Sequence, residues 1–186
     1  MKRLLLIIIL TFSLQSLIKA DDIRDFQIEG MSIGDSLLDY YSESEIENRK
    51  LPLSIGGKEF KLYSKIYLDD KNKTYDRLVL YYKTDDQNYI IKGIAGRNYY
   101  HNNISECYDL QKNIVNEIGS IFSNARKKNY GKVKNQHFPK GDSKKHDISF
   151  YFKDGSMAQI TCYDYSIKDT QSRDRLSVAI TTKEYL

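Results

Sequence analysis

The start of the chain constrains everything that follows it, because it has the pattern of a secretory signal. Two basic residues precede a short, mostly apolar run, Leu4–Leu14, and Ala20 offers a small residue to a signal peptidase. The alternative, an uncleaved membrane anchor, needs roughly 20 apolar residues, about twice the length of this run. No cysteine follows the run to carry a lipid. We therefore predict a cleaved signal peptide at residues 1–20 and a periplasmic or secreted mature chain without a transmembrane span.

Removal of the leader changes the charge of the chain. The full sequence holds 29 basic and 25 acidic residues, and three of the basic ones, Lys2, Arg3 and Lys19, belong to the leader. The mature chain would carry 26 basic and 25 acidic residues, a formal net charge of +1. A nearly neutral domain exerts no general attraction on nucleic acid, so we expect no nucleic-acid partner.

The two cysteines predict one disulfide bond. Cys107 falls on the apolar face of a predicted helix, and Cys162 falls on the inward face of a predicted strand. In an oxidising compartment an even pair of this kind indicates a bridge. Closing their 55-residue separation would stabilise the fold by about 4 kcal/mol on the chain-entropy model. The alternative is a reactive thiol, but neither cysteine belongs to a Cys-x-x-Cys motif.

Hydrophobic periodicity predicts a single α+β domain over residues 21–186. Apolar residues recur at helical spacing in two segments, 33–47 and 104–123. Alternation typical of strands marks six further segments: 60–68, 75–83, 89–100, 148–152, 158–162 and 176–180. Short turns between neighbouring strands predict antiparallel meanders with the helices packed on the sheet. The order α-β-β-β-α-β-β-β leaves open a tandem pair of units, 31–100 and 104–182, although no residue-level repeat is visible.

Three glycines inside these elements predict local irregularities. Gly93 and Gly96 lie within one strand and indicate a bulge or a close backbone approach. Gly119 lies inside the second helix, where it costs about 1 kcal/mol relative to alanine, so we expect close packing there.

Residues 124–147 have the composition of a long polar loop. The loop is strongly basic and holds a single acid, Asp142, between Arg126 and Lys145. One interpretation is contact with an anionic surface, such as lipid headgroups, lipopolysaccharide or an acidic partner protein. The other is a solvated loop without a partner. The residues of the possible contact are Arg126, Lys127, Lys128, Lys132, Lys134, Lys140, Lys144 and Lys145.

Motifs for catalysis, cofactors or metals are absent from the sequence. The three histidines, His101, His137 and His146, lack the paired spacing of metal sites. The serine-hydrolase, β-lactamase and zinc-protease signatures are also missing. We therefore assign no catalytic, cofactor-binding or metal-binding residue.

Two resemblances follow from particular segments. The run ADDIRDFQIEGMSIGDSLLDYYSESEIE, with CYDLQKNI and ITCYDYS, resembles a group of small exported, uncharacterised proteins from A/T-rich marine bacterial genomes. That resemblance implies a periplasmic or secreted location and no mechanism. The Gly30-Met31-Ser32 opening is similar to that of the periplasmic BamE and β-lactamase-inhibitor-like domains, in which a capped helix precedes a meandering sheet.

These observations favour a non-enzymatic binding or accessory module that contacts a protein or the envelope surface. The sixteen tyrosines suit such a role, because a large ring with a hydroxyl tolerates both apolar and wet surroundings. Two alternatives stay open: a small hydrolase, and a small-ligand-binding protein, each with a site assembled from distant segments. Both alternatives require a pocket with convergent polar groups.

Overall fold

A computed structural model describes residues 23–55, 58–69, 74–101 and 103–185. The predicted signal peptide lies outside these residues. Within them, the predicted α+β fold class is confirmed, with two helices, one antiparallel sheet and one disulfide.

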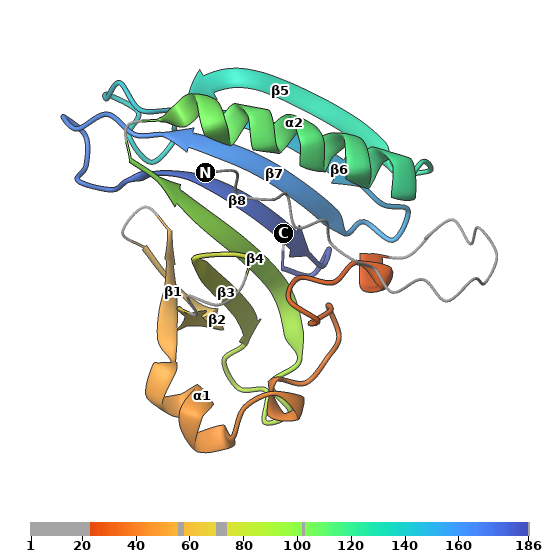
Figure 1. The fold of residues 1–186 in the computed structure, drawn as a ribbon. Helices are drawn as coiled ribbons and strands as arrows, with labels where there is room; N and C mark the ends of the chain where they lie inside the picture. The colour runs from red at the N-terminus through yellow and green to blue at the C-terminus, as the bar shows by residue number, and fades with distance from the viewer. Residues whose placement is uncertain (1–22, 56–57, 70–73, 102, 186) are drawn as a thin grey trace, which may run out of the picture.

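One eight-stranded antiparallel sheet runs through the described part of the chain, in the order β1-β2-β3-β4-β8-β7-β6-β5 (Figure 1). Each half of the chain contributes a four-stranded meander, and the two meanders join where β4 pairs with β8. The strands are β1 (Leu51–Ile55), β2 (Lys58–Leu68), β3 (Arg77–Lys83), β4 (Ile91–Tyr100), β5 (Arg126–Lys134), β6 (Lys144–Tyr151), β7 (Met157–Asp164) and β8 (Asp174–Thr181).

The helix α2 (Ile104–Ile121) covers one face of the sheet, where it contacts β7, β8 and β4 (Figure 1). Its apolar stripe, including Val115 and Ile118, packs on the inward row of the strands, such as Ile160 and Val178. This helix was predicted from the same periodicity, because only an amphipathic stripe can bury one side of a helix on a sheet.

The segment before β1 departs from the predicted helix at 33–47. Within the predicted range, a 3-10 turn occupies Leu37–Asp39, and the α-helix begins only at α1 (Glu43–Arg49). Gly34 has a φ of +97°, a left-handed conformation that no right-handed helix contains. The backbone at this point pairs with β4 instead, since the Gly34 amide donates to the Ile91 carbonyl at 3.0 Å.

The helix α1 begins at a capping box. The Ser42 hydroxyl accepts from the Glu45 amide, and the Glu45 carboxylate accepts in return from the Ser42 amide at 2.9 Å. This arrangement satisfies two amide groups that the first helical turn leaves without partners. The predicted start at residue 33 was therefore placed about ten residues too early.

Two strands were missing from the predicted order, which named three strands in each half. The structure adds β1 at one edge of the sheet and β5 at the other. The predicted loop over 124–147 was wrong, because β5 and the first half of β6 lie within it. All residues of β5 except Gly131 are exposed, so the strand has no buried row that alternation could reveal. Lysines on an edge strand hinder pairing with a further chain.

The Cys107–Cys162 disulfide is present and ties the first turn of α2 to β7. Both cysteines are fully buried in the main core. The bond therefore fixes the helix to the sheet at the centre of the hydrophobic core.

We predict that replacing both cysteines with serine lowers the free energy of unfolding by about 2–5 kcal/mol, because the unfolded chain regains the entropy of the open 55-residue loop. Urea denaturation of the oxidised protein and of the Cys107→Ser/Cys162→Ser variant measures the difference. Equal midpoints and slopes would contradict the prediction.

Of the two glycines predicted to mark a bulge or a close backbone approach in β4, Gly93 lies next to a register shift, whereas Gly96 meets a side chain. A Cβ on Gly96 would lie 2.6 Å from Cγ of Tyr75, so the aromatic ring occupies the space of a side chain. Next to Gly93 the register of the β3–β4 pair shifts between Tyr81 and Tyr82. In contrast, a Cβ on Gly119 would meet Cε1 of Phe150 at 3.7 Å, an ordinary contact.

These distances predict opposite signs for two alanine substitutions. Gly96→Ala displaces the buried Tyr75 ring and lowers the free energy of unfolding by about 1–3 kcal/mol. Gly119→Ala raises it by about 0.5–1 kcal/mol, because alanine favours the helix and its methyl group fits. Thermal denaturation of the two variants checks the pair, and a loss of stability in both would show that α2 packs more tightly than described.

Candidate functional site

The face of the sheet opposite α2, here called the open face, carries a polar surface instead of a core. Small residues form its centre, including Gly93, Ala95 and Ala179 on the paired strands β4 and β8. At one side Tyr185 folds over the face and packs on Tyr81, with ring centroids 5.0 Å apart. The rest of the open face is covered by long side chains of the strands themselves.

Arginines and tyrosines gather on this face in what we call the Arg–Tyr cluster. The guanidinium of Arg175 lies 4.6 Å from the ring centroid of Tyr163, and Arg97 lies 6.0 Å from that of Tyr67. Contacts of this kind are attractive because the face of an aromatic ring carries partial negative charge. The cluster consists of Arg77, Arg97, Arg173, Arg175, Tyr67, Tyr81, Tyr99, Tyr163 and Tyr165.

The arginines of the cluster differ in their partners. Arg77 donates to Asp69 at 3.0 Å and is neutralised by it. Arg97 and Arg175 form no ion pair with a carboxylate of the described residues, and the buried Nε atom of each lacks a hydrogen-bond partner there. Burial raises the pKa of Tyr81, so its hydroxyl, 3.5 Å from Arg97, stays neutral. The charges of Arg97 and Arg175 therefore have no compensating acid among the described residues.

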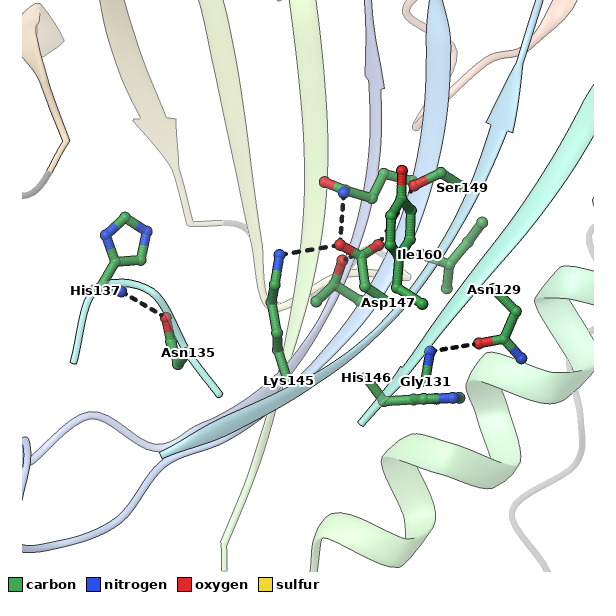
Figure 2. Close-up of polar contacts among 12 residues, drawn as sticks. Asn129, Gly131, Asn135, His137, Lys145, His146, Asp147, Ser149 and Ile160 are labelled. Carbon is green, nitrogen blue, oxygen red and sulfur yellow. Dashed lines mark hydrogen bonds and ion pairs between the residues drawn. The ribbon is translucent and has the colours of Figure 1, made fainter. Parts of the chain in front are cut away.

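Beside this cluster, Asp147 on β6 forms a closed polar network (Figure 2). One carboxylate oxygen accepts from Lys145 at 3.0 Å and from Gln159 at 2.9 Å. The other accepts from the hydroxyls of Ser149 at 3.4 Å and Thr161 at 3.3 Å. Asp147 is only 4 % exposed, and the fully buried Ser149 has no access to a substrate. The network thus holds β6 to β7 and leaves no acid, base or nucleophile free.

We predict that Asp147→Ala lowers the free energy of unfolding by about 2–4 kcal/mol, because it removes the common acceptor of four buried or half-buried donors. The exposed Asp109→Ala on α2 serves as the control and should change stability by less than about 0.5 kcal/mol. Urea denaturation measures both, and similar values for the two variants would contradict the structural role of Asp147.

A groove of about 500 Å³ lies on the other face, between α2 and β5. His146 lines it, and the Nδ1 atom of His146 lies 2.6 Å from Oε1 of the buried Gln111. The Gln111 amide nitrogen donates to two backbone carbonyls, those of His146 and Ile160. Its oxygen must therefore be the acceptor, which places the proton of neutral His146 on Nδ1. Burial, together with Lys132, lowers the pKa of His146.

The basic residues predicted to contact an anionic surface do not form one patch. Arg126 and Lys128 project onto the open face, whereas Lys127 and Lys132 project toward α2. Lys145 forms the ion pair with Asp147. The other three lie toward the far end of the β5–β6 hairpin: Lys134, Lys140 and Lys144. Their contact with an anionic surface stays a prediction.

The three histidines make separate contacts. His101 lies 3.1 Å from Arg173, His146 contacts Gln111, and the amide of His137 donates to Asn135. Within the described ranges, no group of three histidine, cysteine or acidic side chains is arranged to hold a metal ion.

The Arg–Tyr cluster was not predicted from the sequence. A signal was present in the alternation of β2, where Tyr63, Lys65 and Tyr67 occupy three successive outward positions. The equivalent positions of β4 and β8 carry Arg97 and Arg175. Only the pairing of these two distant strands brings the arginines together.

Comparison with known proteins finds no matching family model, no matching curated protein and no matching solved structure. The part of the chain that the structure describes has no helix with the length and hydrophobicity needed to cross a membrane.

Proposed function

We propose that the protein is an exported, non-enzymatic binding module that docks an acidic segment of a partner protein on the open face of its sheet. The proposal is carried by Arg97 and Arg175, whose buried Nε atoms lack acceptors among the described residues. A buried donor without a partner costs free energy. The side chains as a whole are half-buried, so a carboxylate supplied by another chain can approach the two guanidinium groups and compensate their charge.

The composition of the cluster supports a protein partner. Tyrosine and arginine are enriched in protein interfaces and supply a large share of their binding free energy. The planar guanidinium matches the geometry of a carboxylate better than an ammonium group does. The side chains that surround Arg97 and Arg175 are tyrosines, which tolerate burial on one side and water on the other.

A lipid surface fits this cluster less well than a peptide. The nearly planar headgroup region of a bilayer meets protruding lysines first. Arg97 and Arg175 instead lie half-buried on the two central strands, next to the small residues Ala95 and Ser177. An extended acidic segment can lie along these strands and bring its carboxylates to the two side chains.

Export belongs to the same proposal. It is supported by the apolar leader at residues 1–20 and by the joining of Cys107 to Cys162, since disulfides persist in oxidising compartments. The resemblance to small exported proteins points to the same location.

The test is a titration of a fluorescent oligo-glutamate peptide at low ionic strength, followed by anisotropy. We expect the Arg97→Gln/Arg175→Gln variant to bind about tenfold or more weakly, because two charge-assisted hydrogen bonds are lost. Lys153→Gln, at an exposed site in the β6–β7 turn, removes one positive charge outside the cluster and should bind as the wild type does. Salt should weaken wild-type binding.

Equal affinity of the double variant and the wild type would refute the proposal. Thermal denaturation of both variants shows whether the fold is retained, so that a loss of binding is not mistaken for unfolding.

A further inference from the structure

We infer that the groove between α2 and β5 is a second binding site, whose ligand is a small organic acid that also carries hydroxyl groups. The groove lies on the helix side of the sheet, so this inference does not depend on the acidic partner proposed for the open face. Its volume of about 500 Å³ is within the range of small-molecule sites.

The β5 wall of the groove is positively charged. Lys127 and Lys132 face α2, and neither forms an ion pair with a carboxylate of the described residues. The Lys132 ammonium lies 4.2 Å from the ring centroid of Tyr108 on α2. This contact keeps the charge at the wall of the groove, where an acidic group of a ligand would meet it.

Asn129 adds a directed donor between these lysines. Its side-chain oxygen accepts from the Gly131 amide at 2.8 Å, so the amide orientation is fixed (Figure 2). The NH2 group is left to donate into the groove, which Asn129 lines. Two ammonium groups and one amide are a donor set suited to a carboxylate.

His146 supplies the complementary acceptor. Figure 2 shows its ring on the α2 side of the strand, away from Asp147. Because Nδ1–H donates to Gln111, the Nε2 atom of the neutral ring carries a lone pair. The lowered pKa of His146 keeps the ring neutral near pH 7. A ligand hydroxyl can donate to Nε2, whereas a bare carboxylate or a fully ionised phosphate cannot.

The ligand class follows from both halves of the groove. An acid without a hydroxyl leaves His146 without a donor, and a neutral sugar leaves Lys127 and Lys132 without an anion. A sugar acid meets both requirements and suits the volume of the groove.

Galacturonate is the probe, with galactose and acetate as matched ligands that each lack one of the two features. We expect calorimetric titration at low ionic strength to show that galacturonate binds about tenfold or more tightly than either. The Lys132→Gln variant should bind galacturonate about tenfold more weakly. Lys128→Gln is the control, because this residue lies on the same strand but faces the open side.

Ring nitrogen NMR tests the role of His146 directly. Saturation with galacturonate should shift the Nε2 resonance of His146, whereas acetate should leave it in place, because only the hydroxyl bonds to this atom. A fold-supporting role of His146 alone would give no ligand-dependent shift.

Three outcomes would overturn the inference: no binding of galacturonate to the wild type, equal affinity for acetate, or equal effects of Lys132→Gln and Lys128→Gln. None of them bears on the acidic peptide at the open face, whose test relies on Arg97 and Arg175.

Discussion

The antiparallel pairing of β4 with β8 is the contact on which the rest of the structure depends. Six of the seven pairs of neighbouring strands join strands that follow one another in the chain. The β4–β8 pair instead joins the two halves of the chain, from Gly93 opposite Thr181 to Tyr100 opposite Asp174. Long-range pairing of this kind has to offset a large loss of chain entropy. The helix α2 packs across the joint, and its disulfide to β7 secures it. The same pairing sets Arg97 and Arg175 on neighbouring strands.

The contrast between the two faces of the sheet bears on function. A face without a helix needs polar residues to remain in water, and exposed lysines would be enough for that purpose. The open face instead holds arginines between tyrosine rings, with Nε atoms of Arg97 and Arg175 that reach no acceptor among the described residues. Solvation alone does not explain such buried donors. The proposed docking of an acidic segment rests on this arrangement of Arg97 and Arg175.

Sequence patterns correctly predicted those helices and strands whose apolar residues recur at one regular spacing. Cys107 and Cys162 each lay on an apolar face, and helix and strand periodicity together located the disulfide. The helix predicted at 33–47 failed because Gly34 bends the chain into a contact with β4, a tertiary interaction that outweighs local periodicity. The candidate sites could not be predicted from such patterns. The Arg–Tyr cluster depends on which strands lie next to β4, and the groove depends on how far α2 lies from β5.

The basic segment shows why a run of charge in a sequence is not yet a charged surface. Successive side chains of a strand point to opposite faces, so Lys127 and Lys128 are neighbours in the chain but belong to different surfaces. A bulge between Asn129 and Gly131 then restores Lys132 to the α2 side. The positive charge of β5 is thereby divided, and the part that faces α2 lines the same groove as His146. In a solvated loop none of these lysines would have a fixed direction. In the strand, two of them line the groove.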